Sequence, residues 1–352
     1  MRSYESSVKK ARDISVGIDV HSKSWQVVVV LDDEQLFGGA IGGSWFSLKR
    51  LLSRWDRDRL IVAYEAGFSG FWLYDALKDW GAECLVVPPS LIPTEAGSRV
   101  KTDRRDATKL ALLLSRGLLK QVWVPSVEQR FDREVIRQRR RLVRDRRRLQ
   151  SRIKSLLHWY GLELGTNCGH WTRSFVSNLW QLKFNHDLMQ ASFGRLLEEY
   201  EKITISVHEQ TELVRQLSVT DRYRRKVELL TSLPGIGIIT AMEILTELGD
   251  VSRFSRADKL SAYVGLTPSQ HSSGEHVRFG HITRGGKASL RGMLVESAWI
   301  AVRKDRHFYE TYQRIKQRAG GKRAIVGIAR RLLVCGRAIL LKGQPYRIVP
   351  LT

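Results

Sequence analysis

The chain has 352 residues, enough for two or three domains that each bury a core of their own. Lys and Arg number 59 against 36 Asp and Glu, and this net charge of +23 indicates a polyanionic partner. A basic ribosome-associated or storage-like protein is the alternative, but such proteins rarely have 43% hydrophobic residues and ten Trp. The three cysteines stand singly and form neither a disulfide framework nor a zinc motif, and no apolar run has the length of a signal peptide or a membrane span, so we expect a soluble cytoplasmic protein.

The first 125 residues alternate strand-like and helix-like segments, which is the pattern of an α/β domain. Strands are rich in Val and Ile, and the acidic turn at 32–34 predicts a hairpin. The predicted elements, in chain order, are strands at 14–19, 25–31 and 35–38, a helix at 46–55, a strand at 60–65, a helix at 68–81 that ends at Gly81, and a strand at 83–88.

Residues 126–228 have helical periodicity and predict a basic coiled coil. Eleven Arg lie between Arg130 and Arg152, and apolar residues repeat every seven positions from Val135 to Leu156. This density of one charge favours phosphate contacts over a solvated face of an ordinary packing helix. A second helical stretch near 188–217 either returns antiparallel against the first or serves a dimer. The arginines expected to contact nucleic acid are Arg139, Arg140, Arg141, Arg144, Arg147 and Arg148.

The third region, 229–352, is mostly helical. The segment LLTSLPGIGIITAMEILTELGD predicts helix, hairpin, helix. Gly235 and Gly237 permit a tight turn whose backbone N–H groups could donate to a phosphate oxygen, although a purely structural helical hairpin is the alternative. A polar stretch rich in Ser, Gly, His and Arg follows at 269–286, and two helices are predicted near 287–304 and 322–341.

Four acids in the first region form a pattern that suits phosphodiester cleavage. Cleavage with two magnesium ions needs several carboxylates at one point, because hard divalent cations prefer oxygen ligands. Asp19 and Glu65 end predicted strands, while Asp103 and Asp106 share one face at the start of a helix. Taken singly, each acid is better explained as a helix cap or a surface charge. Together they are typical of a ribonuclease-H-like nuclease core that binds Mg²⁺ or Mn²⁺.

The sequences around these acids, VGIDVHSKSW, YEAG and KTDRRDA in this order, closely resemble the DEDD transposases of the IS110 insertion-sequence family. The resemblance continues through SLPGIGIITA and LSAYVGLTPSQHSSGEHVRFGHITRGGKASLRGMLVESAW and covers nearly the whole chain. It implies a RuvC-like domain of ribonuclease-H fold at 1–125, a coiled-coil domain at 126–228, and a helical C-terminal transposase domain with a helix-hairpin-helix-like element at 229–352. It also implies that the four acids bind metal.

The family's nucleophile is a serine in a Ser-Gly element after GLTP, which matches Ser273 here. This serine is thought to attack DNA and form a covalent phosphoserine link, which would conserve the phosphodiester energy for rejoining. A serine hydroxyl needs activation by a base or a metal ion. Spacing alone does not choose among the neighbouring hydroxyls, which ordinary turns would also explain: Ser269, Ser272, Ser273 and Ser289. Phosphate clamps are expected at Arg278, Arg284, Lys287 and Arg291.

The resemblance implies a magnesium-dependent DNA recombinase, a bacterial transposase that acts on element ends and target as a homodimer or tetramer and associates with the nucleoid when acting. A structured noncoding guide RNA, called a bridge RNA, is also implied and would suit a broad cationic surface with little base readout. A RuvC-type hydrolytic or junction-resolving nuclease is the alternative, since it needs the same acids but no serine. A binding protein that has lost catalysis would need neither.

Overall fold

The computed structural model describes residues 14–93, 103–162, 170–273, 276–283 and 285–351. The chain divides into two compact units, Met1–Val124 and Pro125–Thr352. The predicted middle and C-terminal domains both belong to the second unit, and their separation into two domains stays a prediction. None of the helices in the described part of the chain is long and apolar enough to cross a membrane.

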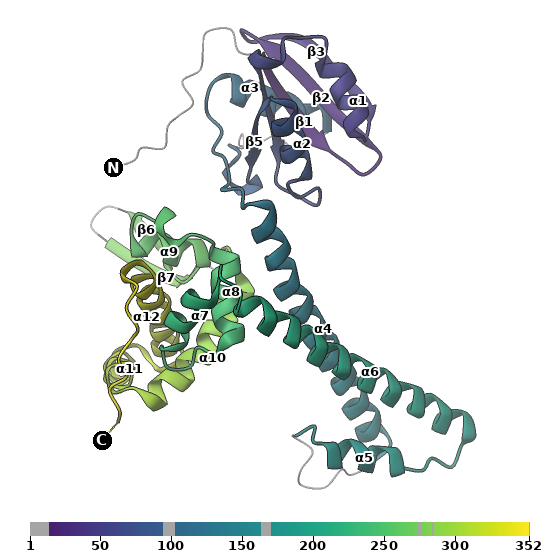
Figure 1. The fold of residues 1–352 in the computed structure, drawn as a ribbon, viewed down its shortest axis with the longest axis vertical. Helices are drawn as coiled ribbons and strands as arrows, with labels where there is room; N and C mark the ends of the chain where they lie inside the picture. Colours follow the sequence, from purple (N-terminus) through teal and green to yellow (C-terminus); the bar gives the residue numbers. More distant parts are fainter. Residues whose placement is uncertain (1–13, 94–102, 163–169, 274–275, 284, 352) are drawn as a thin grey trace. The chain divides into compact units, whose positions relative to one another are not determined.

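The first unit is a mixed sheet with helices on both faces, which confirms the predicted α/β class (Figure 1). Its elements are β1 (Ile14–Val20), β2 (Ser24–Leu31), β3 (Glu34–Gly42), α1 (Trp45–Leu52), β4 (Leu60–Glu65), α2 (Trp72–Trp80), β5 (Glu83–Val87) and α3 (Asp103–Ser115), with short 3-10 helices at Arg57–Arg59 and Pro89–Leu91. The five strands lie in the order β3-β2-β1-β4-β5. β2 is antiparallel to both of its neighbours, whereas β1, β4 and β5 are parallel.

Local sequence explains most of this unit. Asp32 and Asp33 both have positive φ, 49° and 66°, which matches the two-residue turn of a tight hairpin between β2 and β3. Alternation along the strands then separates two buried faces. One face, which includes Ile18, packs against α1 and α2, and the other, which includes Val28 and Ala63, packs against α3.

The second unit is almost entirely helical, as predicted. Its elements are α4 (Val127–Trp159), α5 (Arg173–Gln181), α6 (Asp187–Ser218), α7 (Arg224–Thr231), α8 (Ile238–Leu248), a 3-10 helix at Val251–Arg253, α9 (Ala257–Val264), β6 (Pro268–Ser273), β7 (His276–Ile282), α10 (Ala288–Lys304), α11 (Arg306–Ala319) and α12 (Gly321–Lys342). The sequence did not predict α5, α9, α11 or the antiparallel β6-β7 hairpin. The hairpin lies in the polar stretch, where Ser, His and Arg hide its strand character.

α4 and α6 pack antiparallel, so the second long helix does return against the first. At one end, Gln210 of α6 donates to the carbonyl of Val135 at 3.1 Å. At the other end, Leu157 of α4 and Phe193 of α6 share a small core with α5. The C-terminal helices have a separate large core that joins α7, α8, α9, α10, α11 and α12, and the end of α4 that carries Ile136 packs into it.

Candidate metal centre and nucleic-acid surfaces

Asp19 and Glu65 emerge side by side from the sheet of the first unit. β1 and β4 are parallel neighbours whose pairing runs up to Ile18 and Tyr64, and the two acids occupy the next position on each strand. Since side chains alternate along a strand, both acids belong to the face that α3 covers. Glu65 is the last residue of β4 and Asp19 the second-last of β1, so the expectation that both lie at strand ends is confirmed to within one residue.

Gly17 sets the distance between β1 and α3. A β-carbon at this position would lie 2.2 Å from the carbonyl oxygen of Ala107 and 2.5 Å from the backbone nitrogen of Ala111. Only glycine therefore allows the helix to lie this close to the strand. The same contact places the first turn of α3, with Asp103 and Asp106, next to the end of β1.

Two of the predicted acids meet at a histidine that the sequence argument did not single out. His21 Nε2 lies 3.1 Å from Asp19 Oδ2 and 3.3 Å from Asp103 Oδ2. Ligand atoms of these three residues all lie within 4.8 Å of one another, in an arrangement that could hold a metal ion. The turn that carries His21 is fixed by buried Trp25, whose indole N–H donates to the His21 carbonyl at 2.9 Å. The signal for His21 was its place two residues after Asp19 in the motif.

The Asp19 carboxyl lies close to other charged groups, and they change its pKa. Burial raises the pKa of the Asp19 carboxyl above its ordinary value. The hydrogen bond and charge of His21 act in the opposite direction, while the charges of Asp103 and Asp106 raise this pKa further. Asp106 is thus close enough to influence Asp19. Carboxylates that repel one another in this way are stabilised by a cation placed between them.

The four predicted acids are not equally placed. Asp19 and Asp103 lie in the cluster with His21, whereas Glu65 and Asp106 lie outside it among the described residues. Carboxylate oxygens suit Mg²⁺, and an added imidazole nitrogen is also compatible with Mn²⁺, so the donor set fits a divalent ion of this kind. Binding of metal by these residues stays a prediction.

The predicted nucleophile region is the β6-β7 hairpin of the second unit. Ser273 is the last residue of β6 and pairs with His276. Arg278 lies on β7, whereas Arg284 and Gly274 lie outside the described residues. Among the alternative hydroxyls, Ser289 Oγ accepts a hydrogen bond from Arg140 at 2.7 Å and so has a structural partner.

Two of the expected phosphate clamps have contacts inside the protein. Arg291 donates from one nitrogen to the carbonyls of Val264 and Gly285, both at 2.8 Å, and thereby fixes the loop before α10. Lys287 Nζ lies 3.2 Å from a carboxylate oxygen of Glu247. Their present partners are structural, and a phosphate role for them stays a prediction.

Part of the arginine-rich face of α4 packs against α8. Glu243 and Glu247 of α8 are each only 1% exposed. Arg140 donates to Glu243, and Arg137 donates to both oxygens of Glu247 at 2.8 and 3.1 Å. Arg133 adds a hydrogen bond to the carbonyl of residue 246 at 3.0 Å. These contacts join the arm, which consists of α4, α5 and α6, to the C-terminal helices. The arginine-rich sequence alone did not predict this structural use of arginine.

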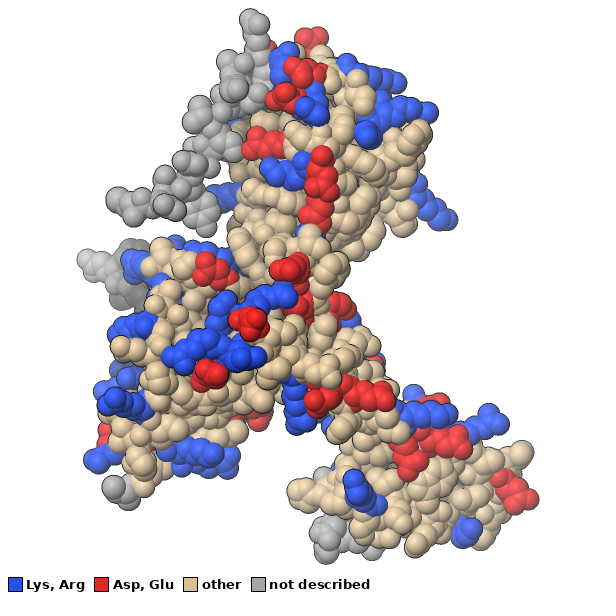
Figure 2. All heavy atoms as spheres, in the orientation of Figure 1, with Lys and Arg blue, Asp and Glu red and all other residues tan. Residues whose placement is uncertain are grey.

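The six arginines expected to bind nucleic acid therefore differ in availability. Arg139 is half-buried and donates to a threonine hydroxyl of α6 at 2.8 Å, and burial lowers its pKa. Arg141 pairs with an acid of its own helix. Arg144 and Arg147 are exposed, and Arg148 is exposed although it pairs with an acid three residues earlier. Figure 2 shows further Lys and Arg gathered over the C-terminal helices.

The predicted helical hairpin is present between α7 and α8. Gly235 has φ of 83°, and a β-carbon there would lie 2.3 Å from the carbonyl oxygen of Ser297 on α10. Close packing thus explains this glycine. Gly237 precedes α8 as its N-cap and is exposed, with open space around the position of a β-carbon. Of the two glycines, Gly237 is the one at the N-terminus of α8, where the first turn of the helix is accessible to a phosphate.

Comparisons with known proteins match both units. Residues 16–161 match a family model described as a DEDD transposase of the IS110 type, and residues 227–313 match one described as transposase of the IS116/IS110/IS902 family. A Sinorhizobium fredii protein named as transposase y4qE is 32% identical over 83% of this chain and 73% of its own. The transposase for insertion element IS1533 of Leptospira borgpetersenii is 28% identical over 68% and 70%, and that for IS1111A of Coxiella burnetii is 26% identical over 82% and 79%.

Proposed function

Because the chain belongs to the IS116/IS110/IS902 family of transposases, we propose that it cuts and rejoins DNA at the ends of an insertion sequence, using a divalent metal ion held by acids of its first unit. One observation carries this proposal. Asp103, at the start of α3, reaches the His21 nitrogen that Asp19, at the end of β1, also contacts. Carboxylates from separate elements thus converge where a transposase of this type needs metal ligands.

Mg²⁺, or Mn²⁺ in its place, is the proposed ion. When bound, it would neutralise charge on the scissile phosphate and lower the pKa of an attacking hydroxyl. Asp19 and Asp103 would hold it, with Glu65 and Asp106 as further oxygen ligands. His21 touches both central carboxylates and would orient them or add a nitrogen ligand. The mixed sheet, with its acids on the face covered by α3, supports a RuvC-like assignment for residues 1–125.

Ser273 is the proposed nucleophile. Its Oγ would bond to phosphorus while the bond from phosphorus to the departing sugar oxygen breaks, and that oxygen would take up the proton. The phosphodiester energy would stay in the phosphoserine link, so that rejoining needs no ATP. The position of Ser273 at the end of β6, inside the matched range 227–313, supports this assignment.

The proposed partners are DNA, a structured guide RNA and further copies of the chain as a dimer or tetramer. A net charge of +23 supports a nucleic-acid partner. The exposed Arg144 and Arg147 and the accessible N-terminus of α8 at Gly237 are the proposed phosphate contacts. RNA guidance and a dimer or tetramer are proposed on the family resemblance alone.

Cleavage of DNA that carries the element's ends tests both parts of the proposal. Asp19→Ala and Asp103→Ala should abolish strand cutting in Mg²⁺ or Mn²⁺. Ser273→Ala should lose a protein–DNA adduct that survives denaturation by detergent, while the matched control Ser272→Ala should keep it. Cutting that persists in Ser273→Ala but not in Asp19→Ala would identify a hydrolytic nuclease instead.

A further inference from the structure

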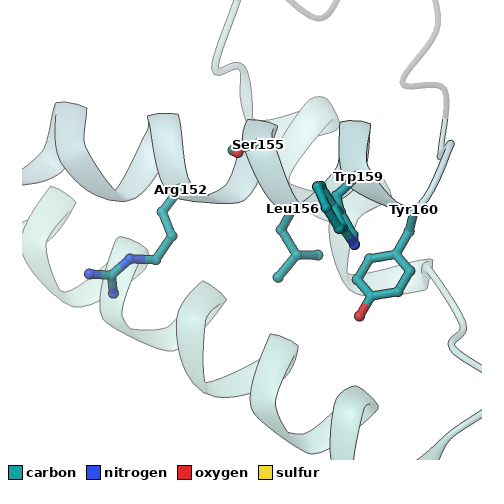
Figure 3. A pocket seen from close by; sticks show the side chains of 5 residues that line it. All are labelled: Arg152, Ser155, Leu156, Trp159 and Tyr160. Atoms are coloured by element: carbon teal, nitrogen blue, oxygen red, sulfur yellow. The ribbon is translucent and has the colours of Figure 1, made fainter.

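A hollow of about 340 Å³ lies at the C-terminal end of α4, remote in sequence from the acids and from Ser273. Figure 3 shows its lining side chains, which all come from the last turns of this helix and the residue after it. They are Arg152, Ser155, Leu156, Trp159 and Tyr160. The set combines aromatic rings, two hydroxyls and a guanidinium in one open site.

Trp159 contributes a large exposed aromatic surface to this site. This residue is 83% exposed, although an indole ring is a large apolar surface to leave in water. The small core between α4, α5 and α6 is filled by Ile153, Leu157 and their partners, and Trp159 is not part of it. The fold of the arm therefore does not explain this tryptophan, and exposed aromatic surface of this kind typically marks a binding site.

Tyr160 gives the hollow a fixed wall. Its ring meets Phe184 edge-on with centroids 5.8 Å apart, and Phe184 in turn meets Phe193 at 5.2 Å. Phe193 is buried in the core of the arm. Packing thus holds the Tyr160 ring in place, although the residue remains 54% exposed. A rigid ring beside an accessible one can bind a flat ligand at low cost in side-chain entropy.

Basic residues predominate at this end of the helix. Residues 146–160 contain four Arg and one Lys and no Asp or Glu, although Asp145, just before this range, pairs with Arg148 at 3.0 Å. Arg148, Arg152, Ser155 and Trp159 are spaced by four, three and four residues, so they form one stripe along α4. All four are exposed. A cationic stripe that ends on an exposed indole matches the two parts of a single-stranded nucleic-acid site, which are phosphate attraction and base stacking.

We propose that this hollow binds an unpaired nucleotide of a single-stranded nucleic acid, with its base stacked on Trp159 and a neighbouring phosphate on Arg152. Ser155 and Tyr160 offer hydroxyls to the sugar or the base edge. Paired bases inside a duplex are stacked on each other and do not present a face to a side chain. A second copy of the chain would bring the same positive stripe, and the two would repel. This inference does not depend on the metal centre.

Binding of short labelled oligonucleotides to the full chain, measured by fluorescence anisotropy in EDTA, tests the site without any cleavage. The probes are oligouridylate, oligothymidylate and a DNA duplex of equal length. Trp159→Ala should weaken binding of the single strands about tenfold, because stacking on one aromatic contributes on that order, and should leave duplex binding unchanged. Trp159→Phe should restore most of the loss. The matched control is Phe131→Ala, which removes a 68% exposed ring from the same helix.

Location is tested separately by photocrosslinking of an oligonucleotide that carries 5-iodouracil. The adduct should map to Trp159 or Tyr160. An equal loss of affinity for oligouridylate and oligothymidylate assigns the contact to base and phosphate. A larger loss for oligouridylate indicates that the Ser155 and Tyr160 hydroxyls contact 2′-OH groups of RNA, and both outcomes support the site. Equal effects of Trp159→Ala and Phe131→Ala, or an adduct elsewhere, would overturn the proposal. So would a Trp159→Ala chain that loses an oligomer in sedimentation velocity but binds single strands normally.

Discussion

Glu247 on α8 is the carboxylate that two arginines of α4 and the N-cap lysine of α10 approach, and its replacement is the sharpest test of how the second unit is held together. Its side chain is 2% exposed and lies 2.8 Å from Arg137, 3.2 Å from Lys287 and 3.6 Å from Arg133. Glu247→Gln preserves the shape of the side chain but removes its charge. Three cations would then share a buried region without their counter-charge.

The expected cost is about 3–5 kcal/mol in the free energy of unfolding, the usual effect of breaking a buried ion pair by removing one partner. At 1.4 kcal/mol for each factor of ten, the folding equilibrium would fall by about 100-fold or more. For a unit of this size the midpoint of thermal unfolding should drop by about 6–20 °C.

Thermal and urea unfolding followed by circular dichroism would measure this loss. The matched control is Glu212→Gln, because Glu212 pairs with Arg215 at 3.2 Å on the exposed surface of α6. That change should cost less than about 1 kcal/mol. Equal losses in the two variants would refute the argument that the buried cluster stabilises the unit.

The same cluster predicts a pH dependence. Burial alone would raise the pKa of Glu247, but the hydrogen bond from Arg137 and the charges of Lys287, Arg137 and Arg133 hold this pKa below its ordinary value of 4.5. A carboxyl whose pKa is lowered by folding stabilises the folded state above its unfolded pKa. The difference in stability between the native chain and Glu247→Gln should therefore be complete at neutral pH and disappear as the pH falls below 4.5.

Three other changes have outcomes that the structure fixes. Gly17→Ala should push α3 away from β1, lower the free energy of unfolding by about 1–3 kcal/mol and weaken Mn²⁺ binding measured by calorimetry. The control Gly292→Ala adds its methyl group in open space on α10 and should not destabilise the protein. His21→Ala should weaken Mn²⁺ binding by about 10–100-fold, and unchanged affinity would exclude His21 from the metal centre. Asp305→Ala removes the cap of α11 and the acceptor for Tyr346, so we expect a loss of about 2–4 kcal/mol and faster proteolysis of the C-terminal tail. Burial and Asp305 raise the pKa of Tyr346 to about 12, so its contribution to stability should be complete below pH 10 and lost as the pH rises toward 12, which absorbance titration can follow.

The elements of the first unit could be predicted closely from the sequence. β4 has the bounds expected from its run of apolar residues, and α2 ends at Gly81, whose φ of 94° permits the turn that follows. Such features depend on neighbours within a few residues. The β6-β7 hairpin escaped prediction for the opposite reason, since its pairing joins polar residues that have no strand pattern of their own.

The candidate site was only partly accessible to the same reasoning. The motifs identified Asp19 and Asp103 as candidate metal ligands. The position of His21 between them depends on the conformation of the turn after β1, which the sequence did not indicate. The arginine run of α4 shows the same limit more clearly. Sequence could not distinguish Arg140, which meets a buried acid of α8, from exposed Arg144 four residues later on the same helix.

The sequence by itself determined the order of strands and helices in the first unit, the acids at their ends and the family to which the chain belongs, because periodicity, turn chemistry and motif wording are local properties. Only the tertiary structure decided that α3 lies against β1 closely enough for Asp103 to reach His21. It also decided which arginines form ion pairs with Glu243 and Glu247. The physical reason is that packing brings together groups far apart in the chain, and desolvation at those contacts then selects which charges must be paired.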